Sequence, residues 1–234
     1  MSVPKEEKKA KKEFVFPLKV LFEDDYLAII HKPAGILVSG NSFKTIANAL
    51  PQNLKKSTQP DVTTPQPVHR LDYGTTGVLL VGKTASSIRA LNKLFEDKEI
   101  QKKYFAVTIG KMEAPLKQER IIDSEIDGKE AITEYKVFKS VVSERFGFLN
   151  IVILRPKTGR RHQLRKHLAS IGNPILGDKE YGKEGLILTG KGIYLHASKL
   201  LFSHPFTDEL VSVTDKINGL RLPTKFSKLF HNSK

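Results

Sequence analysis

Residues 69–77 place one carboxylate, that of Asp72, between a cation and a polar turn that contains two glycines. The segment reads His-Arg-Leu-Asp-Tyr-Gly-Thr-Thr-Gly, and the apolar run 78–81 follows it directly. An aspartate held at the entrance to a buried strand can act as a nucleophile or as an electrostatic anchor, whereas a free surface aspartate cannot. An isolated Arg-x-Asp is more often a structural ion pair, so a catalytic role for Asp72 requires partners elsewhere in the chain.

A second block, residues 155–168, is crowded with arginine, lysine and histidine around a glycine turn. Arg161 and Arg165 are four residues apart, which predicts a shared helix face directed away from the apolar stripe of Leu164 and Leu168. A solvated basic face is the ordinary explanation of such a pattern. The density of cations at the positive end of a helix favours phosphate contact for most of them. One arginine of the block could instead turn inward and pair with Asp72.

Other chemistries find less support in the sequence. There is no cysteine, which excludes disulfides and thiolate sites. His162 and His167 are five residues apart, off a common helix face, with no carboxylate to complete a ligand set, so we expect no metal. His196 and His204 are expected to line the wall of a site, and the turn-rich residues 172–182 are interpreted as an architectural connector.

Residues 77–84 match the spelling of a phosphate-binding loop, Gly-x-x-x-x-Gly-Lys-Thr. The residues between the two glycines are Val-Leu-Leu-Val, which predicts a strand whose amides are committed to a sheet and cannot turn inward onto phosphates. A nucleotide hydrolase built on this segment is therefore an alternative function. It would require turnover of ATP or GTP and a bound metal.

Length, composition and charge narrow the class of protein. The chain has 234 residues, 39% of them hydrophobic, and a formal net charge of +14. These values predict a folded protein that prefers polyanions, with RNA or DNA ahead of an anionic membrane as partner. There is no apolar run of about eighteen residues, and residues 1–13 lack the apolar core of a signal peptide. We therefore expect a cytoplasmic protein without membrane association.

Strands outnumber helices in the predicted order of elements and do not alternate regularly with them, which predicts an α+β fold. Residues 1–13 are predicted to form a flexible charged tail, and residues 14–234 a single domain. Strands are predicted at 18–22, 26–31, 36–38, 78–81, 104–109, 132–138, 148–154, 194–195 and 210–213. Helices are predicted at 42–50, ended by Pro51, after the N-cap Thr84, at 160–171 and near 225–230. Residues 52–67 are predicted to be a long loop.

Several blocks of the chain, taken in order and spacing, resemble the RluA-type family of RNA pseudouridine synthases. They are His-Arg-Leu-Asp at 69–72, Gly-Arg-Arg-His-Gln-Leu-Arg at 159–165, the connector 172–182 and Leu-His-Ala at 195–197, with further similarity at 31–35 and 103–106. The resemblance implies the pseudouridine synthase fold, with a long mixed, largely antiparallel central sheet, flanking helices and a central RNA-binding cleft. It implies no metal and no organic cofactor. Many members carry an N-terminal S4 domain, and the segment before Phe14 is too short to be one, so target choice is expected to depend on the catalytic domain.

The resemblance also assigns roles to individual residues. Asp72 matches the essential catalytic aspartate, Tyr104 the active-site tyrosine that stacks on the uracil, and Arg165 the basic residue that pairs with the aspartate. The other candidates are expected to contact RNA, with Leu200 near the uracil ring. They are His69, Arg70, Arg160, Arg161, His162, Lys166 and Leu200.

The expected activity is the isomerisation of specific uridines in structured RNA, ribosomal or transfer, to pseudouridine. This reaction breaks the bond between ribose carbon 1 and base nitrogen 1, rotates the base and rejoins it through carbon 5. Asp72 could attack the ribose, attack the base or abstract a ribose proton, and the sequence leaves these three roles open. The alternative function is that of a non-catalytic RNA-binding protein that retains the fold. No protein partner is evident, and a monomer is the default expectation.

Overall fold

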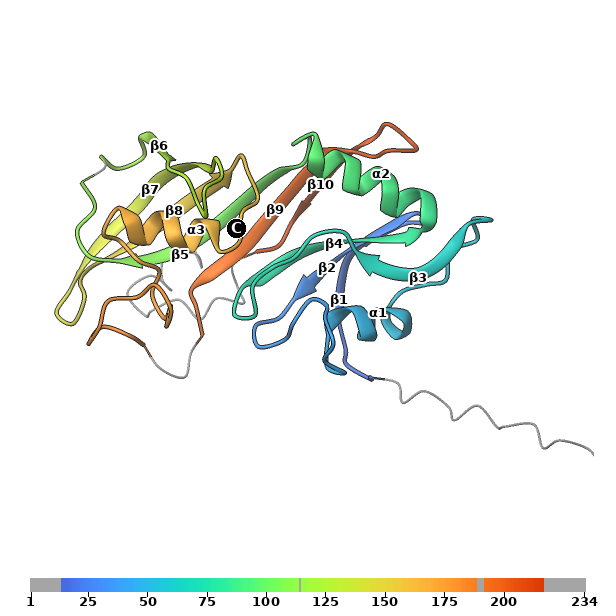
Figure 1. Ribbon diagram of the computed structural model, residues 1–234, viewed down its shortest axis with the longest axis horizontal. Coiled ribbons are helices and arrows are strands. Elements are labelled where there is room, and N and C mark those ends of the chain that lie inside the picture. The colour runs from blue at the N-terminus through green and yellow to red at the C-terminus, as the bar shows by residue number, and fades with distance from the viewer. Residues whose placement is uncertain (1–13, 114, 189–191, 217–234) are drawn as a thin grey trace, which may run out of the picture.

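A ten-stranded sheet runs along the molecule in the computed structural model, which describes residues 14–113, 115–188 and 192–216 (Figure 1). The strand order is β1-β2-β4-β9-β5-β8-β7-β6, with β3 added to β4 and β10 added to β9. Among the described strands, every pairing is antiparallel except that of β4 with β9. The predicted α+β fold with a mixed, largely antiparallel sheet is therefore confirmed.

The strands are β1 (Lys19–Glu23), β2 (Leu27–Lys32), β3 (Val62–Pro67), β4 (Thr76–Thr84), β5 (Gln101–Ile109), β6 (Glu119–Asp123), β7 (Ile132–Ser143), β8 (Gly147–Pro156), β9 (Leu195–Ser203) and β10 (Leu210–Thr214). The helices in the described part of the chain are α1 (Ile46–Asn53), α2 (Ala85–Glu96) and α3 (Gln163–Ser170). Helix α1 packs on β3, α2 packs on β3 and β4, and α3 packs on β8 (Figure 1). The helices therefore flank the sheet towards both of its ends.

Most predicted elements are present, and the exceptions have physical reasons. The predicted loop 52–67 contains β3, whose two prolines are tolerated because this strand pairs with β4 alone and lies at an edge. Strand β6 was not predicted, since only Ile122 in it is buried and the apolar pattern is too short to stand out. The predicted strand 36–38 is reduced to an isolated bridge at Leu37.

Helix α1 begins later than predicted and does not end at Pro51. The Thr45 side chain accepts a hydrogen bond from the Asn48 N–H and caps the first turn, so the helix starts at Ile46. Pro51 lies inside the helix, which ends at Asn53. The predicted cap at Thr84 is confirmed, with a reciprocal capping box to Ser87. The tail 1–13 and the predicted helix near 225–230 lie outside the described residues.

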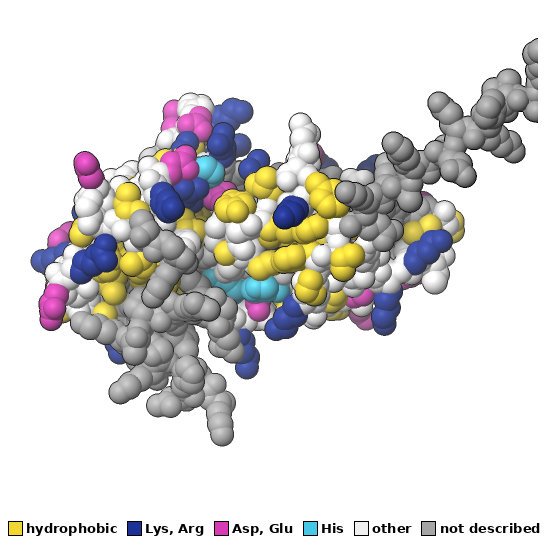
Figure 2. All heavy atoms as spheres, turned by 90° about the horizontal axis from the view of Figure 1, so that it is seen from below, with side chains coloured by type: hydrophobic (Ala, Val, Ile, Leu, Met, Phe, Trp, Pro, Cys, Tyr) yellow, Lys and Arg dark blue, Asp and Glu magenta, His cyan; other side chains and the backbone are white. Residues whose placement is uncertain are grey.

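Two hydrophobic clusters form the core, one on each side of the middle of the sheet. The first joins β2 and β4 to α1 and α2, and the second joins β5 and β8 to α3. Tyr104 of β5 packs partly buried against both clusters. On the face shown in Figure 2, hydrophobic side chains gather in the middle and most Lys and Arg side chains lie around them. The seam between the two clusters is where the candidate site is found.

The sheet divides where β4 meets β9. The two strands pair only at Thr76 with His196 and at Gly77 with Ala197, and β10 takes the same edge of β9 from Lys199 onward. Gly77 has a φ of 113°, and a Cβ at this position would lie 2.0 Å from the Ala197 carbonyl oxygen. Only glycine allows this approach. The close parallel contact therefore anchors the loop that precedes β4, which carries Asp72.

Candidate active site

A cleft of about 950 Å³ crosses the middle of the sheet and contains the three predicted catalytic residues, Asp72, Tyr104 and Arg165. They come from the loop before β4, from β5 and from α3. Five of the predicted RNA-contacting residues also line the cleft: His69, Arg70, Arg160, Arg161 and His162. Lys166 and Leu200 are not among the described lining residues.

The loop that carries Asp72 is held through its backbone. The Thr75 N–H donates to the Asp72 carbonyl oxygen over 3.0 Å, and the Gly35 N–H donates to the Tyr73 carbonyl oxygen over 2.8 Å. The fully buried Lys32 ammonium donates to the carbonyl oxygens of Pro33 at 2.9 Å, Thr75 at 2.9 Å and Tyr73 at 3.3 Å. Burial lowers the pKa of Lys32 to about 8, against the opposing effect of the Asp72 charge. Lys32 therefore places a buried cation directly behind Asp72.

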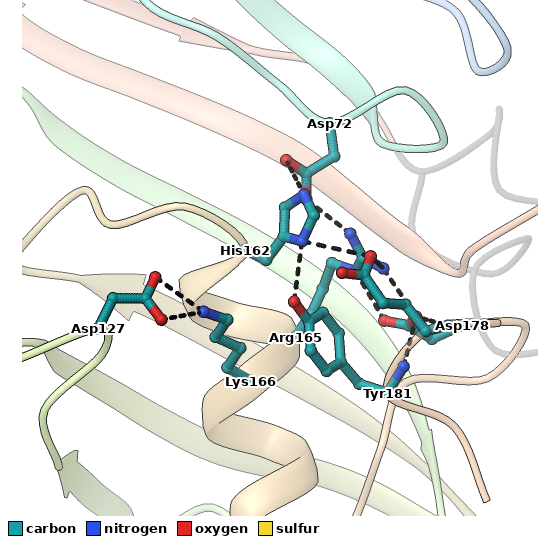
Figure 3. A network of polar contacts seen from close by, with 8 residues as sticks. Asp72, Asp127, His162, Arg165, Lys166, Asp178 and Tyr181 are labelled. Atoms are coloured by element: carbon teal, nitrogen blue, oxygen red, sulfur yellow. Dashed lines mark hydrogen bonds and ion pairs between the residues drawn. The ribbon is translucent and has the colours of Figure 1, made fainter.

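Asp72 faces the side chains of Arg165 and His162 on the opposite side of the cleft (Figure 3). Its Oδ2 lies 3.5 Å from Nη1 of Arg165, and its Oδ1 lies 3.7 Å from Nε2 of His162. Both distances are long for hydrogen bonds, so the contacts are electrostatic and leave the carboxylate oxygens open to a ligand. The Asp72 side chain is 20% exposed, which means that it is neither sealed in the core nor free in solvent.

The Arg165 guanidinium is fixed by acidic residues of the connector between α3 and β9. Nε and Nη2 donate to the two carboxylate oxygens of Asp178 at 2.7 and 2.8 Å, and Nη2 also donates to Glu180 at 3.0 Å. The Tyr181 ring lies over the guanidinium at 4.9 Å (Figure 3). This planar clamp leaves Nη1 directed at Asp72. The connector is thus part of the site, whereas the sequence interpretation treated it as purely architectural.

The charges of this clamp reinforce one another. Burial alone would lower the pKa of Arg165, but the hydrogen bonds and charge of Asp178, and then the charge of Asp72, outweigh it and raise the pKa above its ordinary value. Burial would raise the pKa of Asp178, whose side chain is fully buried, yet the hydrogen bond from Arg165 and the backbone N–H groups of Tyr181 and Glu180 lower it. Both groups therefore stay charged at neutral pH.

His162 occupies a strained position that shortens the predicted helix. Its φ of 55° is left-handed, so α3 begins at Gln163 and not at Arg160. Arg160 and Arg161 therefore lie in the turn before the helix, and the predicted shared helix face of Arg161 and Arg165 is wrong. The strained backbone directs the His162 ring between Asp72 and the Tyr181 hydroxyl, which lies 3.1 Å from Nδ1.

Tyr104 and Leu195 belong to the apolar part of the cleft. Burial, and then the negative charge of Asp72, raise the pKa of the Tyr104 phenol far above its ordinary value, so the phenol stays protonated. Leu195 lines the cleft and was not among the predicted site residues, although it begins the Leu-His-Ala block that carries the resemblance. Leu200 is only 2% exposed and is packed inside the first hydrophobic cluster. The expected contact between Leu200 and uracil is therefore not available in this structure.

Of the predicted RNA-contacting residues, His69 lines the cleft and Lys166 does not. His69 lines the cleft, but its Nε2 accepts a hydrogen bond from the Leu80 N–H at 2.9 Å, and burial, followed by the Lys102 charge, lowers its pKa to about 3. His69 is therefore neutral and offers no positive charge to a phosphate. Lys166 lies outside the cleft and pairs with Asp127 at 2.8 Å (Figure 3).

Two further expectations are corrected. His196 does not line the cleft; it is fully buried behind the Asp72 loop, where Nδ1 lies 2.9 Å from the Thr76 hydroxyl. The buried His204 borders a separate cavity near β10. Its Nδ1 accepts hydrogen bonds from the Phe206 and Thr207 N–H groups in the turn before β10, so His204 stabilises that turn.

The apparent phosphate-binding loop at residues 77–84 is an interior strand. Its residues pair along β4 with β2, and the buried Lys83 ammonium binds Glu23 at 2.8 Å. The segment is therefore committed to the sheet and its lysine to Glu23, so it does not form the phosphate-binding loop that the nucleotide hydrolase alternative requires. No group of three or more acidic or histidine side chains within residues 14–113, 115–188 and 192–216 could hold a metal ion. No helix of the described part is long and apolar enough to cross a membrane.

Comparison with known proteins agrees with this geometry. Residues 26–170 match the family model described as RNA pseudouridylate synthase. The chain is 35% identical over 218 residues to ribosomal large subunit pseudouridine synthase C of Escherichia coli strain K12, covering 83% of this chain and 65% of the relative. It is 36% identical over 214 residues to the protein of the same name from Buchnera aphidicola subsp. Schizaphis graminum, with the same coverage. The chain thus spans 65% of the length of these curated relatives.

Solved structures show the same fold. Human RNA Pseudouridylate Synthase Domain Containing 4 superposes with a TM-score of 0.67 at 26% identity, covering 91% of this chain and 92% of that one. Human RNA Pseudouridylate Synthase Domain Containing 1 gives a TM-score of 0.68 at 22% identity, covering 85% and 83%, which concerns the fold alone. The family match over residues 26–170 includes Asp72, Tyr104 and Arg165. On these grounds, the chain belongs to the RNA pseudouridylate synthase family.

Proposed function

We propose that this protein is an RNA pseudouridine synthase that isomerises uridines of structured RNA, with Asp72 as the essential carboxylate. The observation that carries the proposal is the position of Asp72. It is held from behind by backbone contacts and lies 3.5 Å from Arg165, in a cleft that also contains Tyr104. Binding RNA alone does not require a carboxylate at the centre of a basic cleft, because a carboxylate repels phosphates.

Each of the three central residues has a role that fits its surroundings. Asp72 would initiate the reaction, at the ribose, at the base or at a ribose proton. Arg165 would orient the carboxylate, because the clamp by Asp178 leaves its Nη1 directed there. Tyr104 would stack on the uracil; its raised pKa supports a protonated phenol over a phenolate that removes the carbon 5 proton.

The cleft must also offset the energy of extracting a nucleotide from folded RNA. Flipping a base out of a stack costs roughly a few kcal/mol. Arg70, Arg160 and Arg161 line the cleft and offer positive charge to phosphates around the flipped nucleotide. The names of the curated relatives favour large-subunit ribosomal RNA over transfer RNA as the substrate class.

The test is release of tritium from carbon 5 of uridine. Large-subunit ribosomal RNA from cells lacking the gene is labelled at carbon 5 and incubated with the wild-type chain, with Asp72→Asn and with Asp127→Asn. Asp127 is a matched control because it is an aspartate close to α3 that pairs with Lys166 outside the cleft.

The expected result is release by the wild type and by Asp127→Asn and no release by Asp72→Asn. Equal release by Asp72→Asn and the wild type would refute the role of Asp72. Tight RNA binding by the wild type without any release, on ribosomal and transfer RNA alike, would favour the non-catalytic alternative.

A further inference from the structure

Lys102 also lines the cleft, but the roles proposed for Asp72, Tyr104 and Arg165 do not involve it. It lies on β5 two residues before Tyr104, and both side chains line the cleft. Alternate residues of a strand point to the same face and are separated by about 7 Å, two steps of about 3.3 Å. The two residues are therefore close neighbours on the wall of the cleft, so a nucleotide whose base contacts Tyr104 brings its backbone near Lys102.

The hydrogen bonds of Lys102 are far fewer than an ammonium can make. Its Nζ donates to the Thr158 carbonyl oxygen at 3.3 Å, and none of the described salt bridges involves it. An ammonium has three donors. Lys32, which is also buried, directs its donors to three carbonyl oxygens. Lys32 is thus a satisfied structural cation, whereas Lys102 retains donors for a ligand.

The surroundings of Lys102 are unfavourable to its charge in the absence of an anion. Burial lowers its pKa, and its charge is among the causes that lower the pKa of the neighbouring His69 to about 3. A cation kept in such a place without a carboxylate partner is best explained by an anion that arrives with the substrate. In RNA the anion available beside every base is the phosphodiester group.

We propose that Lys102 binds a backbone phosphate adjacent to the target uridine and thereby sets the position of the flipped nucleotide over Tyr104. This inference rests on the proposed function and adds a phosphate subsite between the end of α2 and the turn at residues 157–160. The turn contributes the Thr158 carbonyl oxygen, which holds the ammonium at the edge of the cleft. Lys102 is a binding and positioning residue and takes no part in bond breaking.

The experiment measures the binding of a short oligouridine RNA at several salt concentrations to full-length chains that all carry Asp72→Asn, so that no turnover occurs. Lys102→Met, Lys102→Arg and Lys103→Met are compared with this parent. Lys103 is the matched control because it is the adjacent lysine of β5, pairs in register with Lys199 and does not line the cleft.

Each phosphate contact contributes about 0.7 to the slope of log K against log salt for a single strand. Lys102→Met is expected to reduce the slope by about this amount and to weaken binding by about tenfold at low salt. Lys102→Arg is expected to keep the slope, and Lys103→Met to match the parent. An unchanged slope for Lys102→Met would overturn the proposal, even if affinity falls, because the contact would then be to a base or to the fold.

An equal loss of slope in Lys103→Met would also overturn it, because the effect would then be one of general charge. Thermal unfolding of each variant shows whether the fold is kept; if Lys102→Met does not fold, Lys102→Gln is measured by the same criteria. Binding needs no turnover, so the two proposals can fail separately. A reduced slope together with absent tritium release would retain the phosphate contact and refute the synthase activity, and the reverse would refute only the contact.

Discussion

The loop that carries Asp72 and the helix that carries Arg165 face each other across the cleft, but they are held in place by different interactions. The Asp72 loop is fixed by backbone hydrogen bonds, by the Lys32 ammonium on three carbonyl oxygens and by the close approach of Gly77 to β9. Arg165 is fixed by side-chain charges, chiefly those of Asp178 and Glu180.

This difference fits the roles that the proposed function gives to Asp72 and Arg165. A carboxylate that reacts must be placed without occupying its oxygens, and backbone contacts to its neighbours achieve this. An arginine has five N–H donors, and three hydrogen bonds from Nε and Nη2 to Asp178 and Glu180 lock the guanidinium while Nη1 still points at Asp72. The stability of the Asp72 side should therefore depend on the space around its backbone. The Arg165 side should depend on the charges that surround the guanidinium.

The largest expected effect is on the Asp72 side. Gly77→Ala places a Cβ 2.0 Å from the Ala197 carbonyl oxygen at a φ of 113°, so β4 and β9 must separate. We expect a loss of at least about 3 kcal/mol in the free energy of unfolding, measured with urea. Gly128→Ala is the control, with a φ of 70° and open space around its Cβ, for which about 1–2 kcal/mol is expected. Equal losses of stability in the two variants would show that the β4–β9 contact does not require glycine at position 77.

On the Arg165 side, Asp178→Asn keeps the shape of the clamp and removes its charge. Removing one partner of a buried ion pair leaves Arg165 uncompensated, and about 3 kcal/mol of stability should be lost at neutral pH. Tritium release should fall more steeply than RNA binding, because the guanidinium loses its direction towards Asp72.

The pH dependence of this loss has a defined sign. The pKa of Asp178 is lowered in the folded chain, so its contribution to stability is present above the unfolded value of about 3.9 and disappears as the pH falls below it. The difference in unfolding free energy between the wild type and Asp178→Asn should therefore shrink below about pH 4. A difference that stays constant down to pH 2 would contradict the charge-based clamp.

A smaller effect, seen only in acid, is expected for His69, which supports the Asp72 side through the Leu80 N–H. Its folded pKa of about 3 lies below the unfolded value of about 6.5, so the unfolded chain binds the proton first and stability falls as the pH decreases from 6.5 towards 3. His69→Gln keeps an acceptor and removes the titration. Between pH 7 and pH 5 the wild type should lose about 2 kcal/mol more than the variant. Parallel curves would show that His69 does not titrate this way.

The smallest effect is expected outside the cleft. Lys166→Ala removes the ion pair with the exposed Asp127, and exposed pairs of this kind contribute little. Tritium release should stay within about twofold of the wild type. A large decrease in tritium release would show that Lys166 contacts RNA. The RNA-binding surface on the Arg165 side would then reach beyond the cleft.

Much of the fold and site followed from local patterns in the sequence. The apolar runs of β2, β4, β5 and β8 and the Thr84 cap depend on side chains close together in the chain, so period and capping rules located them. Asp72 and the cations of residues 155–168 stood out because each lies beside a glycine turn, whereas the resemblance to the family singled out Arg165 among those cations. Strand β3 escaped detection because its pairing with β4, and not its own proline-bearing sequence, makes it a strand.

By itself the sequence determined which residue types were available for the chemistry, their order along the chain and the elements that carry them. Only the tertiary structure decided that Asp178 clamps Arg165, that Lys32 stands behind Asp72, and that Leu195 lines the cleft while Leu200 is buried. The physical reason is that these contacts depend on which face a strand presents and on how widely separated segments meet. Strand register and the left-handed turn at His162 set both, and neither leaves a mark in the local sequence.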